Sequence, residues 1–154
     1  MTTMIKRSLP LLFALLLAAC SAGEEPRAAE FVPPADSSID FGDLRVHYNA
    51  LPTLGLSEAV AREYGVARDA GSAMVVIALR RIADGQELGA DGEVSAEAYD
   101  LQGKRQHIDF SAVRTGDYTD HIGTFAISER DSYRFEVKVE SGGRKETVKF
   151  QRNF

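Results

Sequence analysis

The sequence predicts a mostly β protein, built as an antiparallel β-sandwich of about seven strands with immunoglobulin-like architecture. From residue 72 onward, β-branched and aromatic residues alternate with charged ones at a period of two, which is typical of half-buried strands. Short turns rich in glycine and aspartate separate these segments. The chain has one cysteine and no tryptophan, so the Cys–Trp–Cys spacing of true immunoglobulin domains is absent and only the architecture is predicted. A small closed barrel is the alternative.

The strands are predicted from alternation and from the turns that bound them. They cover residues 41–50, 74–79, 93–101, 106–113, 118–127, 133–140 and 146–151. Pro52 ends the first of these, and the apolar run 74–79 is expected to be buried on both faces. Turns are expected at Asp84-Gly85, Gln102-Gly103, Thr115-Gly116-Asp117 and Gly142-Gly143.

One short helix is predicted near residues 57–64. Ser57 is its N-cap, and Gly65 suits the left-handed position that follows a helix. Two turns are too short to be stable alone, so the helix must dock on the sheet. The inward stripe, spaced by four, consists of Leu56, Val60 and Tyr64.

The N-terminus predicts export and lipid attachment. Lys6 and Arg7 precede an apolar run that is shorter than the roughly 20 residues of a membrane span and ends in small residues, as in a cleaved secretory signal. Leu17-Ala18-Ala19-Cys20 is a lipobox, so we expect cleavage after residue 19 and lipidation of Cys20. Two or more acyl chains anchor a protein stably in a membrane. Ser21 favours sorting to the outer membrane of a Gram-negative bacterium, with the domain facing the periplasm.

Three segments are therefore predicted: a signal peptide (1–19), the lipidated Cys20 with a flexible tether (20–38), and one β-sandwich domain (39–154). The tether contains three prolines and few large apolar side chains, so it cannot bury enough surface to fold. Without residues 1–19, which carry two basic and no acidic side chains, 135 residues with a formal net charge of −7 remain. That dispersed acidic charge argues against nucleic acid as a partner.

The predicted domain lacks the common motifs of nucleophilic and metal-dependent catalysis. Because Cys20 is the only cysteine, the domain has neither a disulfide nor a thiol nucleophile. The GxSxG, SxxK and HExxH patterns do not occur in the sequence. We therefore predict no cofactor and a protein that is not an enzyme.

The histidines raise the possibility of a metal site. His107 and Asp109 lie on one face of a predicted strand, and His121, after Asp120, lies on the next. If these strands pair around the turn at Thr115-Gly116, His107 and His121 are diagonal neighbours within about 8 Å. Two imidazoles and a carboxylate suit zinc or copper. The alternative is ordinary histidines on a solvated sheet face.

A second group of residues suggests a binding groove. His47, Tyr48 and Asn49 lie near the end of the first predicted strand, and Arg68 follows the helix. Polar side chains at such a position can line a groove beside a sheet edge. In the alternative interpretation Asn49 caps the loop that follows it, and Arg68 pairs with an acid such as Glu63.

The tract 46–68 resembles a family of small exported gammaproteobacterial proteins classed as a domain of unknown function. In that family a strand with a VHYNA-like tract, here residues 46–50, leads through a leucine-rich loop into a short helix of EVAxxYG type, here residues 58–65. The resemblance extends over residues 39–152, and Ala59 departs from its pattern. It implies a fold and an exported setting and brings no activity.

From these observations we predict a lipid-anchored binding or scaffolding module whose partner is an envelope protein. The alternative is a metal-binding or hydrolytic protein that uses the predicted His/Asp cluster. A third possibility, a ligand-binding barrel, requires an apolar internal cavity.

Overall fold

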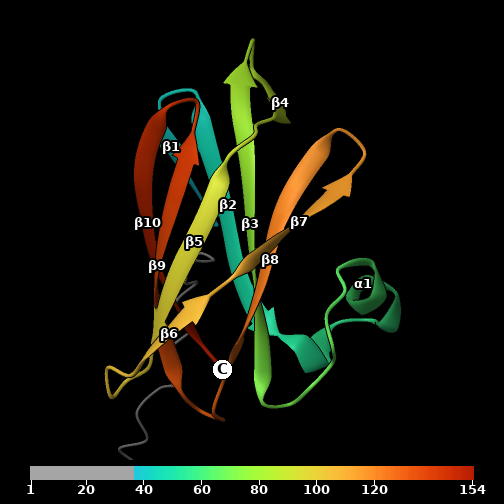
Figure 1. Ribbon diagram of the computed structural model, residues 1–154, viewed down its shortest axis with the longest axis vertical. Coiled ribbons are helices and arrows are strands. Elements are labelled where there is room, and N and C mark those ends of the chain that lie inside the picture. Colours follow the sequence, from blue (N-terminus) through green and yellow to red (C-terminus); the bar gives the residue numbers. More distant parts are fainter. Residues whose placement is uncertain (1–36) are drawn as a thin grey trace, which may run out of the picture. The chain divides into compact units, whose positions relative to one another are not determined.

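In the computed structural model, which describes residues 37–154, the chain forms two antiparallel β-sheets packed face to face (Figure 1). The predicted signal peptide, Cys20 and nearly all of the predicted tether lie outside the described residues. The β-sandwich prediction is confirmed, with ten strands in the described residues rather than about seven. None of the helices in residues 37–154 has the length and apolar character needed to cross a bilayer.

The two sheets have different strand orders. Sheet A follows the order β1 (Ser38–Phe41), β2 (Leu44–Pro52), β3 (Ser72–Ala83), β8 (Tyr118–Ala126) and β7 (Phe110–Thr115), with β4 (Gln86–Gly89) paired to β3. Sheet B follows the order β10 (Arg144–Asn153), β9 (Ser132–Ser141), β5 (Glu93–Tyr99) and β6 (Arg105–Ile108).

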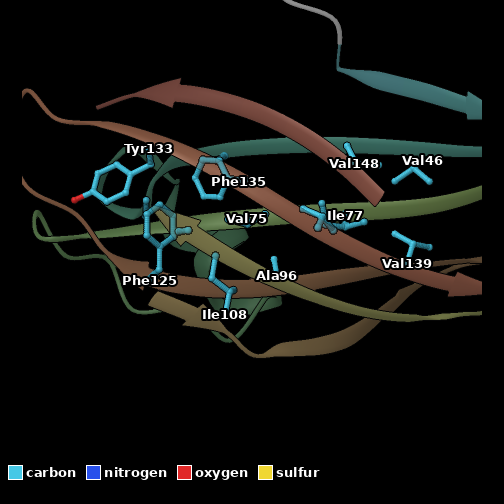
Figure 2. Close-up of a cluster of buried hydrophobic side chains, with 14 of the residues drawn as sticks. Val46, Val75, Ile77, Ala96, Ile108, Phe125, Tyr133, Phe135, Val139 and Val148 are labelled. Atoms are coloured by element: carbon cyan, nitrogen blue, oxygen red, sulfur yellow. The ribbon is translucent and has the colours of Figure 1, made fainter. Parts of the chain in front are cut away.

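The main core lies between the sheets. Alternation places one apolar face of each strand inward, as in β9, where Phe135 and Val137 are fully buried. Figure 2 shows aromatic rings grouped at one end of this core and smaller aliphatic side chains at the other. The ring of Phe125 meets those of Tyr133 and Phe135 edge to face, with centroids 5.2 and 5.3 Å away. Such pairs add about 0.5–1.5 kcal/mol each beyond the area they bury.

A second, smaller core lies on the outer face of sheet A. The predicted helix is confirmed as α1 (Glu58–Glu63), preceded by a 3-10 turn, η1 (Thr53–Gly55). The Ser57 hydroxyl oxygen accepts a hydrogen bond from the Val60 amide at 3.2 Å, and Gly65 has a left-handed φ of 65°. Side chains of the helix and of the residues flanking it cover part of sheet A. They are Leu56, Val60, Ala61, Tyr64 and Val66, packed near Met74, Val76, Val113 and Ile122.

Two predicted strands differ from the structure. The segment 41–50 contains the end of β1 at Phe41 and most of β2, and the turn at Gly42 (φ 65°) joins these two strands into a hairpin. The segment 106–113 is divided at Asp109 into β6 of sheet B and β7 of sheet A. At this crossing the chain passes over Gly123, where a Cβ atom would lie 2.5 Å from Ile108 Cγ2. The sequence between 106 and 113 contains neither glycine nor proline, so its alternation is typical of a single strand.

Candidate functional site

The part of the outer face of sheet A that α1 leaves open carries a network of charged side chains. We call Asp40, Arg45, His47 and Glu87 the Arg45 cluster. Arg45 binds Asp40 through two hydrogen bonds, Nε–Oδ1 at 2.6 Å and Nη2–Oδ2 at 2.8 Å. Its Nη1 donates to Glu87 Oε1 at 2.8 Å, and the other Glu87 oxygen lies 3.0 Å from His47 Nε2. Three strands, β1, β2 and β4, thus contribute to one chain of ion pairs.

The electrostatics of the cluster centre on its guanidinium. The hydrogen bonds from Arg45 lower the pKa of Asp40 and, together with one from His47, the pKa of Glu87. In return, the hydrogen bonds to Asp40 and Glu87 raise the pKa of Arg45. Hydrogen bonds between charged groups with this two-pronged geometry are stronger and more directional than neutral ones. Both carboxylates are therefore ionised at neutral pH and fixed in position.

A second ion pair adjoins the cluster across β3. Arg80 Nη2 donates to Asp120 Oδ1 at 2.8 Å, and their side chains are only 12% and 18% exposed. The Arg80 guanidinium also lies 4.4 Å from the ring centroid of Tyr118, whose hydroxyl donates to the Glu87 carbonyl oxygen at 3.2 Å. Tyr118 therefore links this pair to the strand that carries Glu87.

Nearby, the α1 side of the face adds a tyrosine. Burial, followed by the negative charges of Asp120 and Glu63, raises the pKa of Tyr64. Tyr64 thus remains a neutral phenol between the ion pairs and the apolar contacts of the helix. The face changes from charged to apolar at this residue.

This arrangement is suited to recognition. The side chains of Arg45, His47 and Glu87 are about one-third exposed, so a partner can reach them, and their mutual hydrogen bonds already hold them in place. A preordered surface of both signs selects a partner with the complementary pattern and loses little side-chain entropy on binding. Each carboxylate already pairs with an arginine, which disfavours its use as a general base.

The predicted groove residues separate in the structure. His47 belongs to the Arg45 cluster, whereas Tyr48 points into the core and stacks on Phe150 with centroids 4.7 Å apart. Asn49 Oδ1 accepts hydrogen bonds from the Ala50 amide at 2.9 Å and from Arg152 Nη2 at 3.2 Å. Successive residues of a strand face opposite sides of the sheet, so consecutive side chains cannot line one groove.

The fourth groove residue, Arg68, lies in the loop after α1. It donates to the Leu54 carbonyl oxygen at 3.1 Å and lies 4.0 Å from Glu58. Arg68 thus pairs with Glu58 rather than with the suggested Glu63, and its hydrogen bond to Leu54 connects the loop to η1.

The predicted metal ligands also lie apart. On sheet B, His107 Nδ1 lies 3.1 Å from Glu97 Oε1, and Nε2 lies 3.3 Å from Asp109 Oδ1. His121 instead points from β8 toward the interior, is 7% exposed, and has Nε2 3.1 Å from the Gly92 carbonyl oxygen. The strand switch at Asp109 removes the expected pairing, because it places the two histidines in different sheets. Within residues 37–154 no group of three or more His, Cys, Asp or Glu side chains can hold a metal ion.

Of the Arg45 cluster, the sequence predicted only His47; it did not predict Asp40, Arg45 and Glu87, nor Arg80 of the adjoining ion pair. The sequence predicts the turn at Asp84-Gly85 but no strand directly after it, whereas in the structure the chain returns along β3 as β4. Only the register of that hairpin and of β2 on β3 brings Glu87 to Arg45, which is 42 residues away. The available signal was the Asp-Gly pair at 84–85, which is typical of a hairpin turn and allows a strand to return along β3.

The chain matches a known protein family and a crystal structure of one of its members. Residues 38–154 match the model of a family described as Domain of unknown function (DUF4426). The crystal structure of a DUF4426 family protein from Pseudomonas aeruginosa PAO1 is similar, with 28% identity and a TM-score of 0.63. That match covers 76% of this chain and 92% of that one. No curated protein matches the chain.

More distant structures share the architecture. A copper-bound variant of FetP from uropathogenic Escherichia coli strain F11 has 9% identity and a TM-score of 0.55, over 76% of this chain and 88% of its own. FetP from the same strain, expressed recombinantly in the periplasm of E. coli, has 8% identity and a TM-score of 0.53, over 76% and 91%. At these identities the likeness concerns the fold alone.

Proposed function

The chain belongs to the DUF4426 family, and from that premise we propose that it is a lipid-anchored outer-membrane protein whose β-sandwich binds another envelope protein in the periplasm. The observation that carries the proposal is the lipobox, Leu17-Ala18-Ala19-Cys20, some twenty residues before the first strand at Ser38. A domain attached in this way stays near the membrane, where a binding module meets envelope partners. The proposal assigns no cofactor and no nucleic acid partner.

The binding surface in this proposal is the Arg45 cluster. It occupies the part of sheet A that α1 does not cover, and its charges are already ordered by their own hydrogen bonds. Charged groups at a protein interface contribute to specificity and association rate more than to affinity. We therefore expect a partner whose surface presents opposite charges in the matching pattern.

The structural neighbours support the exported setting at the level of the fold. The FetP fold is compatible with the periplasm, because that protein was produced there. The copper of the FetP variant supports no copper site in this chain. The two sequences are only 9% identical, and His107 and His121, the histidines predicted to bind metal, lie in different sheets. The metal-binding alternative is thus not favoured by any observation.

Lipidation is tested on the full-length chain in a Gram-negative host. We expect acyl labelling and sedimentation with the outer membrane, and loss of both in Cys20→Ala, because the thiol is the acceptor of the lipid. Acyl labelling that persists in Cys20→Ala, or a wild-type chain found entirely in the soluble periplasm, contradicts the anchor.

Partner binding is tested by photo-crosslinking in intact envelopes. A photoreactive residue at Ser38, which lies opposite His47 in the β1–β2 register, is expected to give an adduct with another protein. The same residue at the exposed Thr147, on the outer face of sheet B, is the matched control. Glu87→Arg should reduce the Ser38 adduct, and Glu136→Arg on sheet B should not. Equal adducts from both faces, or none from Ser38, overturn the assigned surface.

A further inference from the structure

The strands at the sheet edges differ in how they are protected. β1, β4 and β6 are each four residues long, too short to offer an extended template. β10 is ten residues long, but it carries four basic side chains, Arg144, Lys145, Lys149 and Arg152. Short length and charge are the usual means by which proteins prevent strand addition at a sheet edge.

The remaining edge strand, β7, has little of this protection. It is six residues long, and its sequence, FSAVRT, contains a single charge, that of Arg114. Ser111, Ala112, Arg114 and Thr115 are exposed. Within residues 37–154, β8 is the only strand paired with β7. The backbone N–H and C=O groups of β7 that point away from β8 therefore have no strand to bond.

We infer that β7 is the interface of a homodimer, in which it pairs antiparallel with β7 of a second copy and joins the two A sheets into one. Backbone groups of an exposed edge bind an extended strand by completing its ladder of hydrogen bonds. The strand that fits this edge without charge conflict is β7 of a second copy.

The self-pairing is free of charge conflict. A twofold axis normal to the sheet sets residues of the same face opposite each other, because side chains alternate between faces. An axis at Ala112 places this residue opposite its own copy, Ser111 opposite Val113, and Phe110 opposite Arg114. The one cation therefore meets an aromatic ring, a favourable pair, and never its own copy.

The long edge β10 fails the same comparison. The two registers that pair nine residues of β10 both bring cations together: an axis at Val148 sets Arg144 opposite Arg152 twice, and an axis at Lys149 sets this lysine opposite its own copy. Like charges directly opposite each other destabilise a sheet. Self-pairing along most of β10 therefore brings like charges together, whereas β7 pairs with a second copy over most of its length without such a conflict. Val113 lies on the outer face of sheet A, beside the small core under α1, and would add an apolar contact to the dimer.

Disulfide trapping tests the geometry directly. In the full chain with Cys20→Ala, the substitution Ala112→Cys supplies the sole thiol and places it on the twofold axis. Facing residues of antiparallel strands have Cβ atoms about 4.5–5.5 Å apart, which allows a disulfide after modest adjustment. We expect disulfide-linked dimer in at least about tenfold excess over the same chain carrying the exposed control Thr147→Cys. Equal yields from the two positions overturn the inference.

Sedimentation of the chain with Cys20→Ala gives an independent readout without trapping. At about 100 μM, where a micromolar Kd gives mostly dimer, we expect twice the monomer mass. Ala112→Lys sets two ammonium groups against each other on the axis and is expected to restore the monomer mass, whereas Thr147→Lys is expected to leave the dimer intact. Both sites are exposed, so circular dichroism should show all chains folded. A monomeric parent chain, or a dimer unaffected by Ala112→Lys, overturns the inference. Neither result depends on lipidation or on the proposed envelope partner.

Discussion

The side-chain amide of Gln106 forms two hydrogen bonds with the backbone of Ala126. Gln106 Nε2 donates to the Ala126 carbonyl oxygen at 3.0 Å, and Oε1 accepts from the Ala126 amide at 3.2 Å. β7 pairs with β8 only as far as Gly123, so the end of β8 has no strand on that side. A side chain from sheet B takes the place of the missing strand and joins the two sheets where the chain crosses between them.

Gln106→Ala is therefore expected to destabilise the fold by about 1–2 kcal/mol, because two backbone groups lose their partner in a partly solvated position. Urea unfolding followed by circular dichroism measures this. Gln102→Ala, at an exposed turn residue, is the matched control and should change the free energy of unfolding by less than about 0.5 kcal/mol. Equal effects of the two substitutions would show that the amide contributes nothing to joining the sheets.

Gly123→Ala is expected to destabilise by about 1–3 kcal/mol, as overpacking does in a close-packed interior. The added Cβ would lie 2.5 Å from Ile108 Cγ2 and 2.9 Å from the Asp109 carbonyl oxygen, so the strand crossing must shift. Thermal unfolding measures the loss. Gly55→Ala serves as control, because nothing lies within 4 Å of a Cβ atom there. An unchanged melting temperature in Gly123→Ala would contradict the close approach at the crossing.

Much of the fold follows from local pattern. The alternation across 133–140 predicts β9 with Phe135 and Val137 inward, and the spacing of Leu56, Val60 and Tyr64 predicts the buried side of the helix. These features depend on neighbours in sequence, whose side-chain directions are set by backbone geometry alone. Such elements can be predicted without knowing where the rest of the chain lies.

The candidate site depends on information that is not local. Arg45 and Glu87 meet because β2 and β4 both pair with β3, and their registers are set by the packing of the whole sheet. The switch at Asp109 is equally non-local, since only the space left by Gly123 permits it. The sequence grouped His47 with Tyr48, Asn49 and Arg68, whereas the structure places it beside Glu87, and it grouped His107 with His121, which the switch separates into different sheets.

Phe135→Ala is expected to be the most damaging of these substitutions, at about 3–5 kcal/mol. Its ring is fully buried, stacks on Phe150 at 4.6 Å and meets Phe125 edge to face, so truncation leaves a cavity beside these two rings. Chemical denaturation gives the free energy of unfolding. Tyr48→Phe keeps the stack on Phe150 and should be nearly neutral. Similar losses in the two variants would contradict the central role assigned to Phe135.

The Arg45 cluster predicts how stability depends on pH. The pKa of Glu87 is lowered in the folded state, first by its hydrogen bond from Arg45 and then by that from His47. A carboxyl group of this kind stabilises the fold above its unfolded-state pKa, and that contribution is lost as the pH falls through the folded-state pKa. Glu87→Gln should therefore be less stable than wild type at pH 7, and the difference should shrink below about pH 4, near the ordinary glutamate pKa.

Urea midpoints measured between pH 7 and pH 3 test this sign. Glu129→Gln is the control, because Glu129 is exposed and forms no ion pair within residues 37–154, so its profile should run parallel to wild type. Asp40 has a lowered pKa through the same arginine and remains in Glu87→Gln, so part of the acid sensitivity must persist in that variant. A Glu87→Gln profile that stays parallel to wild type down to pH 3 would mean that the Arg45–Glu87 bond adds nothing to folding, and that the cluster is held together by Asp40 alone.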